Sequence, residues 1–310
     1  MISLFGGTGT LGRELLPRLS AQGRRVRVIA RHAPPSDPAF SGLEVEWLAG
    51  DVREPRVLNA ALHGVDTIVS AIAGFGRPDA LGSRAVDRDG NVALIEAARR
   101  AGVRSFVMLS IHEAGPEHPI ELFRDKWAAE EALRASGLAW TIIRPTAYLE
   151  SWLGLVGGPL VTTGKTRIFG NGRNPINFVS TADVASFVQL AINDPNLHGS
   201  AIEVPGPENL TLDDLASLVE SASGRTGRKN HVPRALLHLL RLATRVPKPV
   251  LSSLIATALV MDTRDMTVDG RALRARYPAI PLTTASEVAT GMVATWEGRA
   301  VNGIPGRASN

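Results

Sequence analysis

The first sixteen residues constrain the fold more than any other part of the chain. Met1 to Phe5 form a short apolar run that predicts a strand, and an apolar helical pattern begins at Arg13. Between them lies Gly6-Gly7-Thr8-Gly9-Thr10-Leu11-Gly12. Glycines at these positions let the backbone turn sharply and approach a ligand with no Cβ in the way. The stretch also satisfies the Gly-x-Gly-x-x-Gly dinucleotide template.

The surroundings of this stretch favour a dinucleotide over a simple tight connection, which is the alternative interpretation. The first N–H groups and the positive dipole end of the following helix suit a diphosphate. A second strand ends about 20 residues further on, where the template requires it. We therefore predict that a dinucleotide is bound by Gly6, Thr8, Gly9, Thr10, Leu11 and Gly12.

The end of the second predicted strand, Val26 to Ala30, indicates which dinucleotide. An NAD site usually has an acidic residue there, which accepts hydrogen bonds from the ribose hydroxyls. This chain has Arg31, which cannot accept but can pair with a 2′-phosphate. We read this as a preference for NADPH; the alternative is a surface arginine.

Strands and helices then alternate without exception as far as residue 145. The expected strands are 43–49, 65–71, 103–109 and 139–143, and the expected helices are 55–62, 87–101 and 121–136. This alternation predicts an α/β fold, a Rossmann-type doubly wound parallel sheet with ligands at the carboxyl ends of its strands. Residues at those ends are expected to contact the cofactor: Asp51, Val52, Ala71, Ile72, Ala73, Pro145 and Thr146. For Asp51, capping of the next helix is an alternative. Asn91 is expected to hydrogen-bond to a neighbouring strand end.

After residue 145 the pattern changes, and this change suggests a second lobe. We predict a nucleotide-binding core at 1–145, to which 178–205 returns, and a smaller, mostly helical substrate lobe at 146–177 and 206–300. Residues 148–177 are glycine-rich and are expected to be irregular, and 301–310 are expected to form a flexible tail. The apolar helical stretch 233–262 fits core packing, the lining of a substrate pocket, or a protein-partner surface.

Composition excludes several classes of site. The chain has 310 residues and no cysteine, so it has no disulfide, thiolate zinc site or cysteine nucleophile. We expect a cytoplasmic protein without a signal peptide or a metal. The longest apolar run, 254–261, is too short to span a membrane. The net charge is +4, but the arginine clusters have no interleaved aromatics, so nucleic acid is not an expected partner.

Several of these features together resemble one known group. They are the N-terminal glycine motif, Gly50-Asp51, Asn91-Val92 through Ala101-Gly102-Val103, Ser110, Ser136-Gly137-Leu138 and Thr141 to Pro145. As a set they resemble atypical short-chain dehydrogenases/reductases of the NmrA-like and isoflavone-reductase-like branch, over residues 1 to about 205. The resemblance implies a Rossmann fold that binds NAD(P) and an oxidoreductase activity.

Ordinary members of that superfamily carry Tyr-x-x-x-Lys, and this chain lacks the tyrosine. Four residues before Lys126 stands Leu122, and no tyrosine precedes Tyr148. The atypical branch keeps a lysine followed four residues later by glutamate, here Lys126 and Glu130. The resemblance therefore implies that Lys126 holds the nicotinamide ribose or acts in catalysis. The alternative is an i,i+4 ion pair with Glu130 on a solvated helix.

The remaining catalytic candidates follow strand ends. Ser110 and His112 come just after the fifth strand, and Tyr148 comes just after the sixth. His112 and Tyr148 are candidate proton donors. A structural or exposed histidine and an aromatic pocket wall are the corresponding alternatives.

Two functions of different classes follow from these residues. The first is an NADPH-dependent reductase that transfers a hydride to a small apolar substrate, aromatic and conjugated ones included. The second is a non-catalytic NADP(H)-binding redox sensor or regulatory protein of NmrA type, whose C-terminal helices contact a protein partner. A sugar-nucleotide epimerase is disfavoured, because that chemistry relies on the missing phenol.

Overall fold

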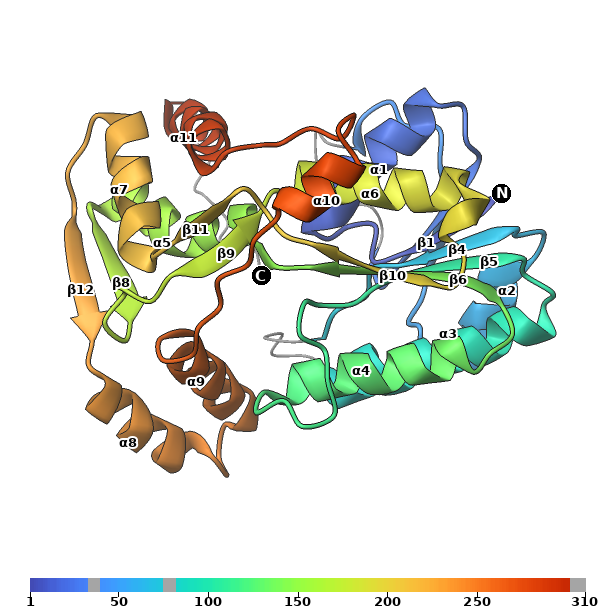
Figure 1. Ribbon diagram of the computed structural model, residues 1–310, viewed down its shortest axis with the longest axis horizontal. Helices are drawn as coiled ribbons and strands as arrows, with labels where there is room; N and C mark the ends of the chain where they lie inside the picture. Colours follow the sequence, from blue (N-terminus) through green and yellow to red (C-terminus); the bar gives the residue numbers. More distant parts are fainter. Residues whose placement is uncertain (33–39, 75–81, 302–310) are drawn as a thin grey trace. The chain divides into compact units, whose positions relative to one another are not determined.

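The computed structural model describes residues 1–32, 40–74 and 82–301, and the chain divides into two compact units (Figure 1). Unit 1 consists of Met1–Pro145 and Val184–Val204, and unit 2 of Thr146–Asp183 and Pro205–Asn310. Each unit is described by itself.

Unit 1 is built on a seven-stranded sheet in which every neighbouring pair is parallel. In sequence its strands are β1 (Ile2–Phe5), β2 (Val26–Ala30), β3 (Glu46–Ala49), β4 (Thr67–Ser70), β5 (Ser105–Leu109), β6 (Ala139–Pro145) and β10 (Ser200–Val204). Their order across the sheet is β10-β6-β5-β4-β1-β2-β3. The chain winds outward in both directions from β1 and β4, which is the switch point where doubly wound sheets bind nucleotides. The predicted fold class is confirmed.

Helices cover both faces of this sheet (Figure 1). On one face lie α1 (Thr10–Ala21) and α6 (Thr181–Asn193), joined by a hydrogen bond from Arg18 to Ser186. On the other face lie α2 (Pro55–Leu62), α3 (Asp89–Arg100) and α4 (Glu121–Arg134). Between this second layer of helices and the sheet, Leu94, Leu133 and Phe106 belong to one buried apolar cluster. Burying each such side chain stabilises the fold by about 1.5–3 kcal/mol relative to leaving it exposed.

Unit 2 combines helices with two small sheets. The strands β11 (Glu208–Leu210), β9 (Ile176–Val179) and β7 (Ala147–Tyr148) form one sheet, and β12 (Arg228–Val232) and β8 (Lys165–Phe169) form the other. The helices are α5 (Leu149–Thr163), α7 (Leu212–Ser223), α8 (Arg234–Thr244), α9 (Pro249–Met261), α10 (Arg271–Arg276) and α11 (Ala285–Val301). Side chains of α5, α7 and α11 form the apolar core of this unit.

The expectation of an irregular stretch at 148–177 is wrong, because α5, β8 and β9 lie within it. The glycines of α5 serve helix packing: a Cβ on Gly157 would meet the Cγ2 atom of Val219, on α7, at 2.4 Å. A glycine-rich sequence therefore marks a close helix contact here and not a loop. The predicted helix at 87–101 also differs, since it opens with the π-helical turn η2 (Arg84–Arg88) before α3.

Two expectations concern membranes and the C-terminus. Within the described part of the chain, no helix combines the length and the apolar character that crossing a bilayer requires. Helix α11 runs to Val301, and the rest of the predicted flexible tail, 302–310, lies outside the described residues.

Candidate functional site

The glycine-rich turn between β1 and α1 has the geometry of a backbone cradle. Gly6 has a φ of 85°, in the left-handed region that favours glycine, and its carbonyl accepts from the Gly9 N–H at 3.1 Å. A Cβ on Gly12 would lie 2.1 Å from the carbonyl oxygen of Gly7, so α1 packs directly on the turn. Gly9 is different, because a Cβ there would meet only the Gly6 carbonyl oxygen, at 3.3 Å, among the described residues. Gly9 and Thr10 are exposed, whereas Leu11 is buried in the core.

The start of α1 suits an anion. Gly9 is the residue before the helix, no side chain caps it, and the first turn contains no acidic residue. The first N–H groups of an uncapped helix are unsatisfied and carry the positive end of the dipole. This end of α1 therefore has room and donors for a diphosphate.

Arginines surround the ends of β2 and β3. Asp51 accepts hydrogen bonds from the side chain of Arg53 at 2.8 and 2.7 Å and from its N–H at 2.9 Å. These side-chain bonds, with the charge of Arg31 adding to them, hold the pKa of Asp51 below its ordinary value although burial opposes this. Asp51 does not cap α2, since the residue before that helix is Glu54. The charge of the ionised Asp51 carboxylate is therefore already balanced by Arg53. Val52 beside it is buried.

Of the three residues after β4, Ala71 lies against the glycine turn and Ile72 against Lys126. A Cβ on Gly6 would meet the carbonyl oxygen of Ala71 at 2.3 Å, so the two backbones touch. Ile72 is buried and Ala73 is exposed. As expected, Asn91 bonds a strand end: it accepts from the hydroxyl of Ser70, the last residue of β4, at 2.6 Å.

Lys126 is the centre of a buried polar network at the ends of β4 and β5. Its ammonium donates to the carbonyl oxygens of Ile72 at 3.0 Å and Leu109 at 3.1 Å, and it forms an ion pair with Asp87 at 3.0 Å. The side chain of Lys126 is 7% exposed and that of Asp87 is 0% exposed. Asp87 also accepts from the Gly74 N–H at 2.9 Å. Two carbonyl oxygens thus accept hydrogen bonds from this ammonium group, and the Oδ1 atom of Asp87 contacts it as an ion pair without a hydrogen bond.

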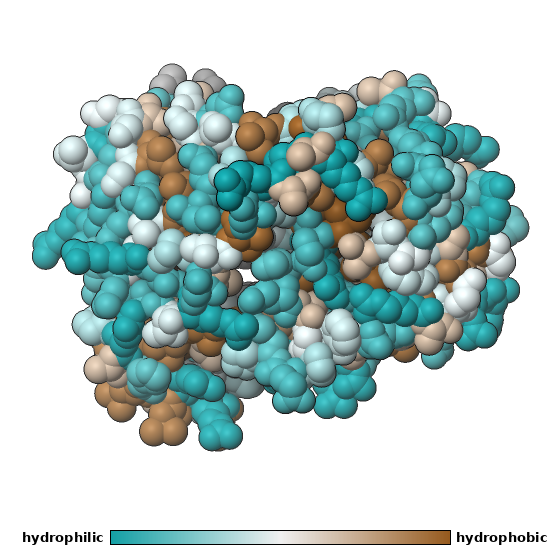
Figure 2. Space-filling model, viewed as in Figure 1, coloured by the Kyte–Doolittle hydropathy of each residue, from teal (hydrophilic) through white to brown (hydrophobic). Residues whose placement is uncertain are grey.

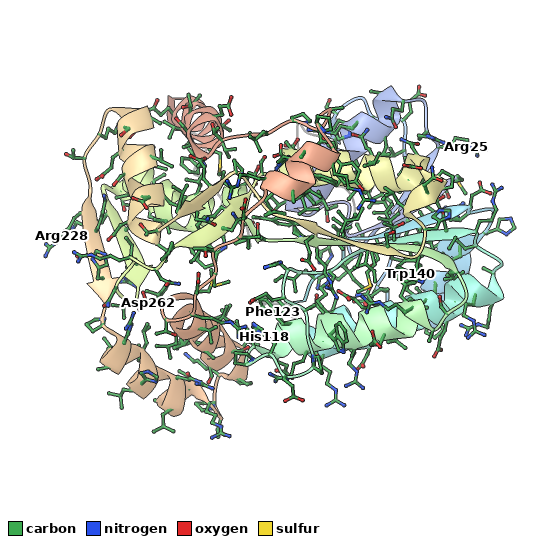
Figure 3. All side chains as sticks on the ribbon, in the orientation of Figure 1. Arg25, His118, Phe123, Trp140, Arg228 and Asp262 are labelled. Atoms are coloured by element: carbon green, nitrogen blue, oxygen red, sulfur yellow. The ribbon has the colours of Figure 1, made fainter. Side chains whose placement is uncertain are left out.

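The local fold fixes where Lys126 lies. His118 and Phe123 stack with ring centroids 3.9 Å apart at the start of α4 (Figure 3). The stack holds the loop before α4 in place, one turn ahead of Lys126.

The alternative interpretation of Lys126, an ion pair with Glu130, is wrong. Glu130 is fully buried and pairs with Arg144 and Arg134. Lys126 pairs instead with Asp87, which lies 39 positions earlier in the sequence. Both side chains of the family motif are therefore buried, each with a partner from a distant segment.

Ser110 and His112 follow β5 closely but differ in their bonding. The Ser110 hydroxyl is buried and has no hydrogen-bond partner among the described residues. His112 bonds Glu203 through Nδ1 at 2.8 Å, and Arg144 bonds the other Glu203 oxygen at 2.9 Å. Burial opposes ionisation of Glu203, but these two hydrogen bonds lower its pKa. His112 is thus an oriented side chain and not merely an exposed one.

The last predicted residues lie where unit 1 ends and unit 2 begins along the sequence. Pro145 ends β6, and its carbonyl accepts from the His112 N–H at 2.9 Å. Thr146 and Tyr148 belong to unit 2, where the Thr146 hydroxyl bonds Asn177 at 2.9 Å. Burial, and then the charge of Glu150, raise the pKa of the Tyr148 phenol.

Sequence reasoning missed Asp87 and Glu203. From the sequence, Asp87 is predicted only to begin a helix, and no role is predicted for Glu203. Both are acidic residues inside otherwise core-forming segments, which is the signal that could have drawn attention to them. Among the described residues, no group of three or more His, Cys, Asp or Glu is placed to hold a metal ion.

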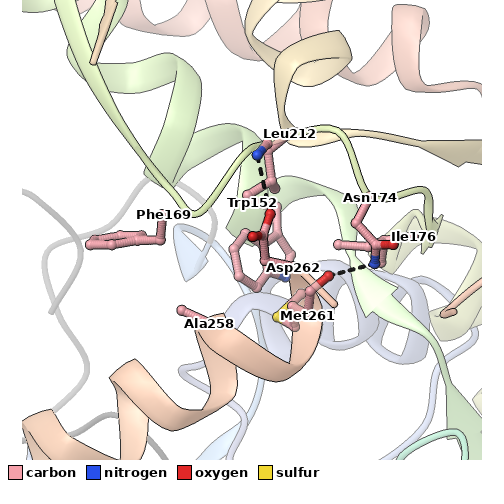
Figure 4. A pocket seen from close by; sticks show the side chains of 9 residues that line it. Trp152, Phe169, Asn174, Ile176, Leu212, Ala258, Met261 and Asp262 are labelled. Atoms are coloured by element: carbon pink, nitrogen blue, oxygen red, sulfur yellow. Dashed lines mark hydrogen bonds between the residues drawn. The ribbon is translucent and has the colours of Figure 1, made fainter. Parts of the chain in front are cut away.

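A narrow pocket lies within unit 2 (Figure 4). Trp152, Phe169 and Ile176 line it, and Asp262 closes it by accepting from the Gly172 N–H at 3.2 Å. Its volume of about 20 Å³ has room for roughly one water molecule. The pocket is therefore too small for an organic substrate.

The family follows from comparison with known proteins. A family model described as NAD(P)H-binding matches residues 6–195. The chain belongs to this family. It binds NAD(P)H, and its relatives include reductases of the isoflavone-reductase-like branch, so the predicted resemblance and the dinucleotide are confirmed.

Three relatives illustrate the range of the family. The chain is 31% identical over 231 residues to the NAD(P)H azoreductase of Xenophilus azovorans, which covers 74% of this chain and 76% of that one. It is 29% identical over 249 residues to the photosystem II assembly factor Ycf39 of Synechocystis, at 79% and 74% coverage. It is 27% identical over 249 residues to an isoflavone reductase homologue of Zea mays, at 75% and 77% coverage. Across the first curated relatives, the match spans 61% to 76% of the relative's own length.

The fold also has solved counterparts. The NADPH-dependent quinone oxidoreductase QOR2 of Escherichia coli, solved with NADPH, superposes with a TM-score of 0.72 at 21% identity. The superposition covers 94% of this chain and 99% of that one. The likeness shows a shared fold.

Proposed function

We propose that this protein is an NADPH-dependent reductase that passes a hydride to a small apolar acceptor, with conjugated and aromatic compounds as the preferred class. The proposal rests on what lies at the carboxyl ends of the strands in the unit 1 sheet. The exposed Gly9 and the uncapped end of α1 offer a site for a diphosphate there, and the buried Ser110 hydroxyl at the end of β5 is unpaired among the described residues. The relative named NAD(P)H azoreductase supports the acceptor class.

The residues fit NADPH in two respects. Gly9 has no side chain that would block the diphosphate, and a Cβ there would already meet the Gly6 carbonyl oxygen at 3.3 Å. At the adenosine end, Arg31 follows β2, and the nearby Asp51 is neutralised by Arg53. Guanidinium groups at this end suit a 2′-phosphate, and the Asp51 carboxylate, paired with Arg53, is not available to ribose hydroxyls.

The chain's own groups would position the reactants and manage one proton. The bound dihydronicotinamide supplies a hydride, and the acceptor also gains a proton. His112 is the candidate donor: Glu203 occupies its Nδ1, which leaves Nε2 for a substrate. Tyr148 is the second candidate, because a phenol is protonated at neutral pH; burial raises its pKa and makes it the weaker acid.

Lys126 has a defined place in this proposal. A hydrogen bond from its ammonium to a ribose hydroxyl would compete with the bonds to the Ile72 and Leu109 carbonyls and with the ion pair to Asp87. Ser110 has no such competition, and we place it among the groups that contact the bound ligand.

A steady-state assay tests the reductase. Purified protein with NADPH is offered a panel of quinones, azo dyes and enones, and consumption is followed at the absorbance of the reduced cofactor. Substrate-dependent consumption is expected for at least one class. Consumption that never exceeds the substrate-free rate would refute the activity.

The cofactor preference is tested separately by calorimetry. Replacing Arg31 by Ala should weaken NADPH binding about 10- to 100-fold, the value of one charged hydrogen-bonded pair, and leave NADH affinity unchanged. Arg56→Ala, at an exposed arginine paired with Glu54, is the matched control. Equal losses for both nucleotides would contradict the role of Arg31.

A second function, a non-catalytic NADP(H) sensor, is favoured by a different observation. Leu122 occupies the position of the usual catalytic tyrosine, and one relative is named an assembly factor. This function predicts nucleotide binding without turnover, so tight NADPH binding in calorimetry and a silent substrate panel would together select it.

A further inference from the structure

The hairpin of α8 and α9 in unit 2 gathers exposed apolar side chains. Eight large hydrophobic residues are exposed in the described part of the chain, and six of them lie here. They are Leu236, Leu239, Leu240, Leu242, Val246 and Leu251. The space-filling view shows brown atoms at the lower left, over α8 (Figure 2). Contiguous apolar surface of this kind marks an interaction site.

Helix α8 is amphipathic in a particular way. It buries one residue, Leu237, against Ile255 and Leu259 of α9. Leu239 is 63% exposed, Leu242 is 70% exposed and Val246, just after the helix, is 87% exposed. Their spacing of three and four residues places them on one stripe that points away from α9. The apolar stripe thus lies on the outside of the hairpin.

The charge of the hairpin is entirely positive. From Ser221 to Met261 there is no Asp or Glu. The same stretch contains the cations Arg225, Arg228, Lys229, Arg234, Arg241, Arg245 and Lys248. Within the described residues, Arg241, Arg245 and Lys248 have no ion-pair partner, and all three are exposed.

The base of the hairpin is firmly attached to unit 2. Asp262, at the end of α9, bonds Arg234 at the start of α8 and accepts from the N–H groups of Asn171 and Gly172. A Cβ on Gly170 would collide with this carboxylate, at 2.1 Å from its carbon. The hairpin is therefore packed on unit 2, and the exposed stripe is part of its outer surface.

We propose that the α8–α9 hairpin binds the surface of an anionic lipid bilayer, with its leucine stripe in the acyl boundary and its cations at the headgroups. A helix with an apolar face and a basic polar face suits such an interface. A second copy of this chain is a poor occupant, because a two-fold contact would set these cations against themselves with no acidic residue in the hairpin to balance them. An anionic bilayer complements both features, because its headgroups attract the cations and its acyl boundary accepts the leucine stripe.

Vesicle sedimentation tests the proposal. Full-length protein is mixed with phosphatidylcholine vesicles that contain about one-third phosphatidylglycerol, or none, at low and at high salt. We expect binding to the anionic vesicles that weakens at high salt, and little binding to the neutral ones. Equal binding to both compositions would overturn the proposal.

Two variants locate the surface. Arg241→Gln/Arg245→Gln/Lys248→Gln should reduce partitioning about 100-fold, since each cation at an anionic surface is worth roughly five-fold. Leu239→Ser/Leu242→Ser should abolish most of it. The controls are Arg25→Gln/Arg99→Gln/Arg100→Gln, with the same change of charge in unit 1, and Leu282→Ser, at a leucine 50% exposed elsewhere.

The remaining outcomes are decisive as well. Hairpin variants that sediment like the wild type would refute the assignment. So would a wild-type dimer that Leu239→Ser/Leu242→Ser converts to a monomer, since a second copy would then cover the stripe. Capture of a protein through the hairpin, without vesicle binding, would likewise overturn the lipid surface.

Discussion

Replacing Lys126 by Met should destabilise unit 1 strongly. The change removes a buried ammonium group and leaves Asp87, which is 0% exposed, without its counter-ion. It also leaves the carbonyl oxygens of Ile72 and Leu109 without this donor. Removing one partner of a buried ion pair costs about 3–5 kcal/mol, most of it from the uncompensated charge.

The double variant Lys126→Met/Asp87→Asn separates this cost from the function of the lysine. With no buried charge left, the loss should shrink to below about 2 kcal/mol, and the introduced amide oxygen can still accept from the Gly74 N–H. If Lys126 contacts the ribose, the double variant still binds NADPH about 10-fold or more weakly. If Lys126 only braces the two strand ends, the double variant binds like the wild type.

Urea unfolding, followed by circular dichroism and tryptophan fluorescence, gives the free energies. Lys165→Met removes an exposed lysine and should change stability by no more than about 0.5 kcal/mol. A Lys126→Met protein as stable as this control would show that the buried pair is not a net source of stability. A double variant no more stable than Lys126→Met would refute the argument from the unpaired carboxylate.

Three further predictions follow from the structure. Gly9→Ala should keep nearly normal stability but bind NADPH more than about 10-fold less tightly, as measured by calorimetry. Gly12→Ala should lower the free energy of unfolding by about 1–3 kcal/mol, because its Cβ meets a backbone oxygen at 2.1 Å. Equal stabilities of the two variants in urea unfolding would contradict this prediction. Gly157→Ala should lose about 1–3 kcal/mol through its 2.4 Å contact with α7, while Gly154→Ala, with no described neighbour closer than 4.0 Å, should gain up to about 1 kcal/mol; opposite shifts in the urea midpoint check this. Burial raises the pKa of Glu150 in the folded protein, so the folded state binds the proton more tightly, and stability is lost as pH rises from the ordinary value through the raised one; Glu150→Gln should flatten this slope, and an unchanged pH profile would disprove it.

Local patterns predicted the parts of the molecule that depend on neighbouring residues. The strand, glycine turn and helix at residues 1–21 and the alternation up to Pro145 follow from short-range periodicity, and they appear as predicted. Helix α5 did not, because its glycines reflect a contact with Val219, on another helix. A single sequence cannot distinguish a glycine needed for packing from one needed for a turn.

The same limit applied to the candidate site. The family motif draws attention to Lys126, but its nearest candidate partner in the sequence, Glu130, is not its partner in the fold. The pairing with Asp87 depends on how η2 packs against α4, which helical spacing does not encode. The family motif therefore drew attention to a buried lysine, whereas helical spacing offered as its alternative an ion pair that the fold does not form.

The bonding state of the four catalytic candidates ranks them for ligand contact. Lys126 has three protein oxygens around its ammonium, and His112 has one ring nitrogen fixed by Glu203. Tyr148 lies in unit 2. Ser110 alone of these four has a buried polar atom without a partner in the described residues, a state that costs about 1–3 kcal/mol unless a ligand or water satisfies it. Ser110 lies at the carboxyl ends of the strands, next to the Leu109 carbonyl that accepts from Lys126. We therefore expect Ser110 to be the first of the four candidates to contact the bound dinucleotide or its acceptor.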